Sequence, residues 1–109
     1  MAERITAADF GSKVLSAREP VLVEFYSDSC VPCKMLSPVL SQLESELEGK
    51  LGIYKVNAGY EPGLVEQYDV QASPTLIFFS EGREISRLRG MTKKEALMTE
   101  YERIKETKA

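Results

Sequence analysis

Cys30 and Cys33 are the only cysteines in the 109-residue chain, and they stand three residues apart in the segment SDSCVPCKM. Two thiols at this spacing can exchange with other disulfides, ligate a metal or staple a loop. A staple across four residues would stabilise the fold by only about 2 kcal/mol in the chain-entropy description. A closed zinc site needs four ligands, and the chain has no histidine and no third cysteine. The staple and the zinc site stay open as alternatives, but the pair favours redox exchange, and we expect neither a metal nor a bound cofactor.

The elements around the cysteines explain why this spacing favours exchange. The apolar run PVLVEFYS at 20–27 predicts a strand that is covered on both faces, and a helical period begins at Pro32. At the start of a helix, free backbone N–H groups and the helix dipole favour a thiolate. Cys30 has that position and is expected to be exposed, whereas Cys33 should lie one turn inside, within disulfide reach and away from solvent.

The remaining segments predict alternating strands and helices. The helix after Cys33 has one apolar stripe and a glycine stop, formed by Leu36, Val39, Leu40, Leu43, Leu47 and Gly49. Strands are expected at 4–6, 51–57, 75–80 and 83–89, the last two joined as a hairpin across the dipeptide EG. Helices are expected from a capping box at Thr6 and Asp9 to about Ala17, from Pro62 onward, and after a second capping box at Thr92 and Glu95. Right-handed crossovers then predict one α/β domain over residues 1–109, with a mixed sheet covered by helices on both faces.

The composition excludes several classes of protein. With 43% hydrophobic residues, 28% charged residues and a net charge of −3, the chain is typical of a globular protein and not of a nucleic-acid binder. The N-terminal segment lacks the apolar centre of a signal peptide, and no apolar run reaches membrane-spanning length. We therefore expect a cytoplasmic protein without a membrane partner.

Glu24 interrupts the apolar run VLVEFY, where an unpaired carboxylate would be costly. It is either a solvated side chain at a strand edge or a buried acid with a function. Lys55, on the neighbouring predicted strand, is the candidate charge partner, although an ordinary strand-end lysine would look the same.

Taken together, several short motifs resemble the thioredoxin family over essentially the full length of the chain. They are CVPCKM with Pro38 beyond it, KVN at 55–57, EPG at 61–63, SPT at 73–75, EG at 81–82 and Gly90. The resemblance implies the thioredoxin fold, a central mixed β-sheet flanked by four helices. It also implies a monomeric protein-disulfide reductase that works by dithiol exchange and receives electrons from a thioredoxin reductase-type donor.

The resemblance also assigns roles to single residues. Glu24 matches the family's buried acid, which exchanges a proton with Cys33, and Lys55 would be its charge partner. Pro74 matches a cis proline that faces the cysteines, although SPT could also be a simple turn. The family's surface for disulfide-containing protein substrates maps onto Val31, Pro32, Ser73, Pro74, Gly90 and Met91.

The chain departs from the usual family pattern around this surface. Ser29 and Tyr26 stand where tryptophans are usual, Val31 replaces a glycine, Gly59 replaces a frequent aspartate, and Arg89 replaces a small apolar residue. These changes predict that exchange is retained while the choice of partners differs. Two alternatives remain, namely a binding module in which the cysteine pair is a redox latch, and an electron carrier dedicated to one enzyme such as a peroxidase.

Overall fold

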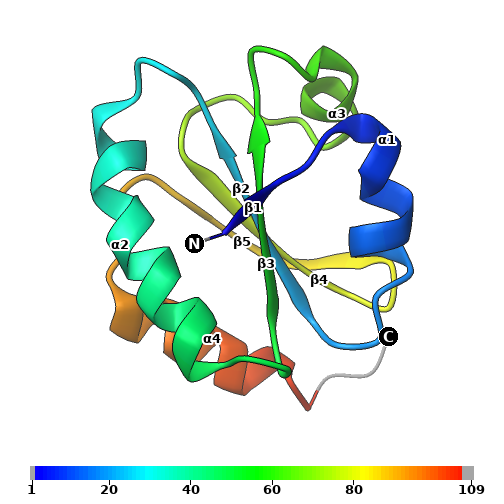
Figure 1. The fold of residues 1–109 in the computed structure, drawn as a ribbon, viewed down its shortest axis with the longest axis vertical. Helices are drawn as coiled ribbons and strands as arrows, with labels where there is room; N and C mark the ends of the chain where they lie inside the picture. The colour runs from blue at the N-terminus through cyan, green and yellow to red at the C-terminus, as the bar shows by residue number, and fades with distance from the viewer. Residues whose placement is uncertain (1, 107–109) are drawn as a thin grey trace.

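This computed structural model describes residues 2–106 of the chain. A mixed sheet of five strands forms the central layer, and helices lie on both sides of it (Figure 1). The strand order is β1-β3-β2-β4-β5. Strands β1, β3 and β2 are parallel to one another, and β4 is antiparallel to both of its neighbours, β2 and β5. The strands are β1 Glu3–Arg4, β2 Val21–Tyr26, β3 Gly52–Asn57, β4 Thr75–Ser80 and β5 Arg83–Arg89. The predicted α/β architecture with a mixed sheet is therefore confirmed.

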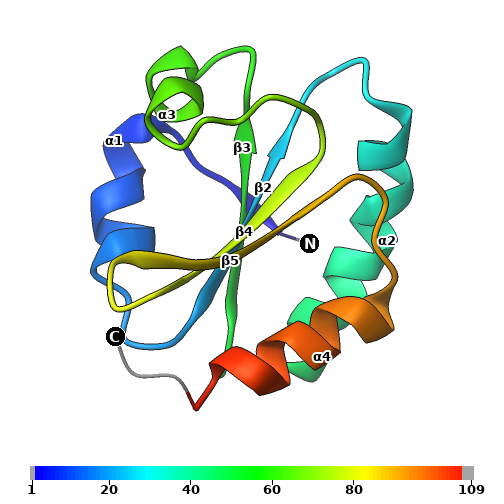
Figure 2. The same ribbon diagram turned by 180° about the vertical axis from the view of Figure 1, so that it is seen from behind.

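Helices cover both faces of the sheet. They are α1 Ala7–Phe10, which continues into the π-helical turn η1 Gly11–Leu15, then α2 Val31–Glu46, α3 Pro62–Gln67 and α4 Lys94–Ile104. Figures 1 and 2 show α2 and α4 on one face and α1 and α3 on the other. Among residues 2–106, no helix is both long enough and apolar enough to span a membrane.

The alternation of side chains along β2 places Glu24 on a defined face. Leu22 belongs to the apolar cluster with α2 and α4, whereas Val23 and Phe25 belong to the cluster with α1 and α3. Because successive side chains of a strand point to opposite faces, Glu24 lies on the α2 face, as Leu22 does. All six residues of β2 are buried, which explains why this strand is an almost continuous apolar run.

One side of α2 anchors the helix against that face of the sheet. Leu36, Leu40 and Leu43 of the predicted stripe are almost completely buried, and Leu47 is buried just beyond the helix. Burial of each leucine side chain stabilises the fold by about 1.5–3 kcal/mol relative to exposure. This packing fixes where the N-terminus of α2, and therefore the cysteine pair, lies relative to the strands.

Both predicted capping boxes are wrong, and the start of the last helix differs from the sequence prediction. Thr6 does precede α1, but its side chain makes no capping hydrogen bond. The last helix begins later than expected, after Lys93, because the Thr92 hydroxyl donates to the carbonyl oxygen of Gly90 at 3.1 Å. The first strand, Glu3–Arg4, starts one residue earlier than predicted and is only two residues long.

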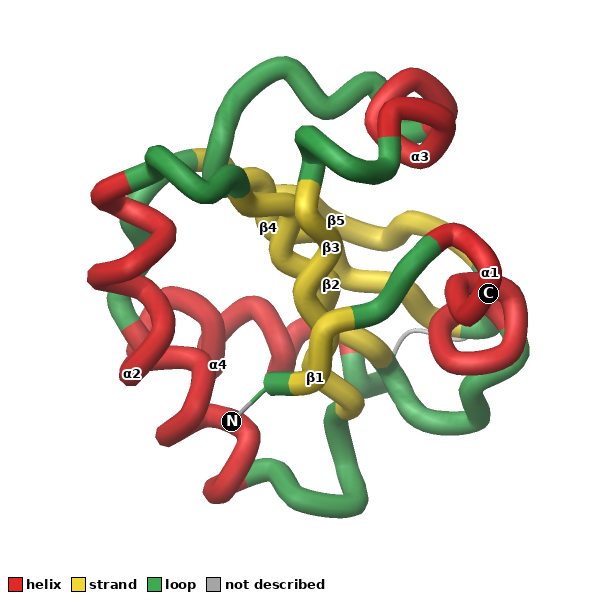
Figure 3. The backbone as a smooth tube through the Cα atoms, turned by 45° about the horizontal axis from the view of Figure 1, so that its top comes forward, coloured by secondary structure: helices red, strands yellow, loops and turns green. Residues whose placement is uncertain are grey.

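Strand register brings four separate segments to one edge of the sheet. Tyr26 at the end of β2 pairs with Asn57 at the end of β3, and Thr75 at the start of β4 lies between Phe25 and Arg89. The loops that follow β2, β3 and β5 and the loop that precedes β4 therefore lie at the same edge of the sheet. In Figure 1 the first two loops and the loop before β4 are at the top, and the loop after β5 lies lower, beside α2; all are green tube in Figure 3.

The hairpin between β4 and β5 turns through two residues with positive φ, Glu81 at 52° and Gly82 at 80°. This is the backbone that a two-residue hairpin turn with the right strand twist requires. A Cβ atom on Gly82 would also lie 3.1 Å from the carbonyl oxygen of Leu15. Glycine is therefore required at this position both by the backbone angle and by the close approach of η1.

Replacing Gly82 with alanine should lower the free energy of unfolding by about 1–2 kcal/mol, because it adds left-handed strain and a close contact. Urea denaturation measures the change. Gly63→Ala is the matched control, because Gly63 lies in α3 with open space around its Cα, and alanine should leave stability unchanged or raise it by up to about 1 kcal/mol. An unchanged urea midpoint for Gly82→Ala would contradict this account of the turn.

Candidate active site

Cys30 and Cys33 form a disulfide at the N-terminus of α2, with their Cα atoms 5.2 Å apart. Cys30 is the N-cap residue, with extended backbone angles, and Pro32 lies in the first turn. The backbone N–H of Cys33 donates to the Sγ atom of Cys30 at 3.1 Å. A thiolate at Cys30 would accept the same hydrogen bond and lie at the positive end of the helix dipole, and both interactions favour the charged form.

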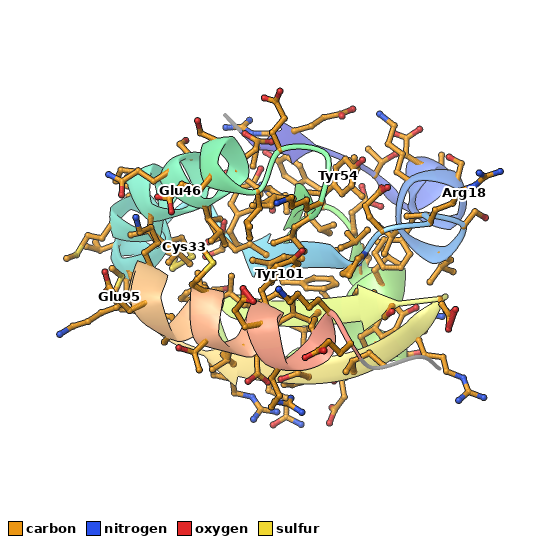
Figure 4. The ribbon with its side chains drawn as sticks, turned by 90° about the horizontal axis from the view of Figure 1, so that it is seen from below. Arg18, Cys33, Glu46, Tyr54, Glu95 and Tyr101 are labelled. Atoms are coloured by element: carbon orange, nitrogen blue, oxygen red, sulfur yellow. A yellow bond between two sulfur atoms is a disulfide. The ribbon has the colours of Figure 1, made fainter. Side chains whose placement is uncertain are left out.

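The exposure of the two cysteines corrects part of the sequence prediction. Cys33 is 4% exposed, as expected, but Cys30 is only 8% exposed and not the open residue that the helix position predicts. The reason is that Tyr26, at the end of β2, packs with both cysteines in one buried cluster. Cys30 is still the more accessible of the two, and Figure 4 shows Cys33 on the α2 side of the molecule, away from Arg18 on the α1 side.

Glu24 is fully buried, which excludes the alternative of a solvated glutamate at a strand edge. Neither of its carboxylate oxygens has a hydrogen-bond partner among the described residues. Burial disfavours the charged form and raises the pKa of Glu24 to about 7, while the positive charge of Lys55 acts in the opposite direction. The side chain can therefore change its protonation state near neutral pH.

Lys55 lies directly opposite Glu24 in the register of β2 and β3. Its ammonium group does not ion-pair with a carboxylate of residues 2–106 but donates to the Ser37 hydroxyl of α2 at 3.2 Å. The same nitrogen lies 4.9 Å from the centre of the Tyr26 ring. The predicted charge partnership with Glu24 thus acts through space and not through a hydrogen bond.

The residues predicted to bind substrate come from three segments at this edge. The Ser73–Pro74 bond is cis, so SPT is not a simple turn, and Pro74 accepts a hydrogen bond at its carbonyl oxygen from the Gly90 N–H at 2.9 Å. Val31 is 63% exposed and Met91 is 46% exposed, while Pro32 is exposed and Ser73 is half-buried. The structure therefore joins the Pro74 and Gly90 segments directly and places accessible apolar side chains on α2 and after Gly90.

A small hollow beside Cys33 contains polar residues that the sequence interpretation missed. It has a volume of about 200 Å³, and we call it the Cys33 hollow; its lining residues are Arg4, Tyr26, Ser27, Asp28, Cys33, Lys34, Ser37 and Lys55. Asp28 and Ser37 are two of the missed residues. In the sequence, Asp28 lies two positions before Cys30 and Ser37 lies one turn after Cys33, but neither position belongs to a motif with a distinctive spacing.

Among residues 2–106, no group of three or more histidine, cysteine, aspartate or glutamate side chains could hold a metal ion.

This combination of a C-x-x-C disulfide at a helix start, a buried acid on the adjacent strand and a cis proline at the same edge defines a thiol–disulfide oxidoreductase. The thioredoxin family model matches residues 1–103. The chain belongs to the thioredoxin family, and its activity is that of a protein-disulfide reductase.

Individual relatives agree with the family match. A Staphylococcus aureus thioredoxin is 40% identical over 94 residues, which cover 86% of this chain and 88% of that protein. A Rickettsia felis thioredoxin is 34% identical over 98 residues, 90% of this chain and 93% of that protein. A chloroplastic M-type thioredoxin of Spinacia oleracea is 36% identical over 90 residues, 83% of this chain but only 50% of the longer plant protein.

The buried carboxyl of Glu24 should make the stability of the wild-type protein depend on pH in a defined way, and Glu24→Leu should remove that dependence. The pKa of Glu24 rises from 4.5 to about 7 on folding, which corresponds to about 3 kcal/mol of destabilisation once the group is ionised. The folded state holds the proton more tightly, so this penalty is absent below about pH 4.5, grows as pH rises to about 7 and is constant above. Glu24→Leu should therefore gain up to about 3 kcal/mol more at pH 8 than at pH 4, measured by urea denaturation.

Glu66→Gln is the control for this measurement, because Glu66 is an exposed glutamate of α3. Its stability relative to the wild type should be the same at both pH values. A stability gain of Glu24→Leu that does not change between pH 4 and pH 8 would contradict the raised pKa.

Proposed function

We propose that this protein reduces disulfides of partner proteins through nucleophilic attack by Cys30 and resolution by Cys33. The observation that carries the proposal is the position of Cys30 as N-cap of α2, where its Sγ accepts a hydrogen bond from the N–H of Cys33. This environment favours the Cys30 thiolate, which is the attacking species. Cys33 is more deeply buried and is the resolving thiol.

The exchange proceeds in two balanced steps. The Cys30 thiolate attacks one sulfur of the substrate disulfide, which forms a mixed disulfide and releases the other substrate sulfur as a thiolate that takes up a proton. Cys33 then loses its proton, attacks the Sγ of Cys30 and releases the second substrate thiolate. Two electrons pass from the dithiol to the substrate, and the protein is left with its Cys30–Cys33 disulfide.

Glu24 is proposed to accept the proton from Cys33. The support is its complete burial on the α2 face of β2 and its pKa near 7, which allows it to take up and return a proton at neutral pH. Lys55 is proposed to assist by limiting the rise of this pKa through its positive charge.

Substrate is proposed to bind as an extended segment across the surface formed by Val31, Pro32, Ser73, Pro74, Gly90 and Met91. The exposed side chains of Val31 and Met91 offer apolar contact, and the backbone next to Pro74 can pair with an extended chain as an added strand. Arg89 is exposed beside Gly90, so the surface is more basic than the family pattern and favours acidic segments.

We further propose that residues 1–109 act as one monomeric, cytoplasmic domain that carries electrons from a thioredoxin reductase-type enzyme to its substrates. The support is the family membership and the absence of a membrane-spanning helix in residues 2–106. Characterised thioredoxins lie near the reducing end of the known disulfide potentials, and Val31 and Pro32 add no positive charge between the cysteines. The proposed direction is therefore reduction of the partner.

The single experiment that tests this function is a disulfide-reduction assay on a model protein substrate, run with and without a standard thioredoxin reductase. Turnover with the reductase and its electron source is expected, and stoichiometric reduction by the pre-reduced protein without it. Stoichiometric reduction without turnover would support a carrier dedicated to another donor. Absence of any reduction would leave the redox-latched binding module as the better account.

The order of attack predicts opposite behaviour for two serine variants. Cys33→Ser should still attack through Cys30 but cannot resolve the mixed disulfide, so substrate should remain covalently bound. Cys30→Ser should capture little substrate, because Cys33 is buried and lacks the N-cap position. Non-reducing electrophoresis and mass spectrometry measure the covalent complex, and trapping by Cys30→Ser in place of Cys33→Ser would reverse the assigned roles.

A further inference from the structure

The segment Ser27–Ser29, which connects β2 to α2, delivers Cys30 to the helix start but is weakly held by its own backbone. In the described part of the chain, its internal backbone contact is one long hydrogen bond, from the Cys30 N–H to the Ser27 carbonyl oxygen at 3.3 Å. Asp28 and Ser29 are exposed. Something other than local backbone pairing must hold this segment if Cys30 is to keep its geometry.

Asp28 supplies that contact. One oxygen of its carboxylate accepts a hydrogen bond from the side-chain amide of Asn57 at 3.0 Å, and the other lies 3.4 Å from the hydroxyl of Tyr60, which donates to it. Asn57 ends β3, and Tyr60 lies in the loop before α3. The three side chains, which we call the Asp28 clamp, thus join the segment before Cys30 to the loop after the neighbouring strand.

The loop on the other side of the Asp28 clamp is shaped to hold Asn57 in place. The side-chain oxygen of Asn57 accepts a hydrogen bond from the Gly59 N–H at 2.9 Å, which leaves its amide group directed at Asp28. A Cβ atom on Gly59 would lie 3.3 Å from that oxygen, so even alanine would press against it. The glycine at this position, a departure from the family pattern, therefore permits the clamp geometry.

Asp28 also lines the hollow beside Cys33. Asp28 is the only carboxylate among the residues that line the Cys33 hollow, where the cations are Arg4 of β1, Lys34 of α2 and Lys55 of β3. The other titratable groups that face this region are the Tyr26 phenol, the buried Glu24 carboxyl on β2, and Tyr60 and Glu61 in the adjoining hollow of about 240 Å³. Removing the charge of Asp28 would leave three cations beside the cysteines without a carboxylate in that hollow.

We propose that Asp28 is a positioning residue for disulfide exchange, which holds the segment before Cys30 through Asn57 and Tyr60 and whose negative charge offsets the cations beside the cysteines. The proposal rests on the proposed function, in which Cys30 attacks as a thiolate. It predicts two separable effects, one from the hydrogen bonds and one from the charge.

Three variants separate these effects. Asp28→Asn keeps an oxygen that accepts from Asn57 but removes the charge, Asn57→Ala removes the donor but keeps the charge, and Asp28→Ala removes both. Asp9→Asn is the matched control, because it removes the same charge from α1, on the opposite face of the sheet (Figure 1). Each variant is compared with the wild type by thiolate absorbance, equilibration with glutathione and amide hydrogen exchange of Cys30 and Cys33, whose N–H groups are hydrogen-bonded.

In the reduced protein, Asp28→Asn should lower the Cys30 pKa by about 0.5, since a nearby negative charge disfavours the thiolate. At a pH above the Cys30 pKa, the equilibrium with glutathione should shift about threefold toward the dithiol, which is about 15 mV. Amide exchange at Cys30 and Cys33 should stay within about twofold of the wild type. Asn57→Ala should instead speed that exchange by about five- to tenfold with little change in pKa, and Asp28→Ala should show both effects.

Two results would overturn the proposal. One is that all three variants behave as Asp9→Asn does in thiol pKa, glutathione equilibrium and amide exchange. The other is that Asp28→Asn and Asp28→Ala give equal amide exchange, which would show that the hydrogen bonds hold nothing. None of these measurements needs turnover of a protein substrate, so a failure of the proposed disulfide-reductase role would be visible separately in the reduction assay.

Discussion

The proposed chemistry depends on one hydrogen bond, from the Cys33 N–H to the Sγ of Cys30 at the first turn of α2. It exists only if β2 ends and α2 begins within a few residues, and if α2 is held firmly against the sheet. The buried leucines of α2 supply the second condition, because they anchor the helix along its whole length. The reactive end of the molecule is therefore positioned by apolar packing that lies well away from it.

At Glu24, in contrast, the feature that serves the proposed chemistry destabilises the fold. A six-residue strand covered on both faces would be most stable with an apolar side chain at every position, yet it carries a carboxyl group without a hydrogen-bond partner in the described residues. The same burial that destabilises the ionised form moves its pKa into the range where a proton can be exchanged at neutral pH. The proposed proton transfer and the predicted instability at high pH are two consequences of one desolvated group.

The cysteine pair keeps the C-x-x-C spacing, whereas residues around it, such as Tyr26 and Ser29, depart from the usual family pattern. Tyr26 packs on both cysteines and is also contacted by cations, with the Arg4 guanidinium 5.7 Å and the Lys55 ammonium 4.9 Å from its ring centre. Asp28 is tied to Asn57 on the next strand and introduces a carboxylate into a hollow that otherwise carries positive charge. Tyr26 departs from the usual family pattern; together with Asp28 it shapes the electrostatic field and the surface that a partner meets, while the cysteine pair keeps its position at the helix start.

Local patterns in the sequence were sufficient for the elements and for the chemistry of the cysteine pair. The apolar run of β2, the leucine stripe of α2 and the EG hairpin each depend on neighbouring residues and on period, so their positions were predicted closely. The N-cap position of Cys30 followed from the same local reasoning, because strand and helix signals meet there. The resemblance to thioredoxin added the buried acid, and the cis proline, which local pattern alone would not predict.

Tertiary structure alone decided which polar groups meet. The start of α4 was mispredicted because the Thr92 hydroxyl bonds to the Gly90 carbonyl oxygen in the turn after β5 instead of capping α4. Cys30 proved to be buried because Tyr26, from the preceding strand, packs over it. The contacts of Lys55 with Ser37 and of Asp28 with Asn57 join residues 18 and 29 positions apart, and no periodicity or spacing records such pairs. Their geometry arises only when the register of β2 and β3 and the packing of α2 are established together.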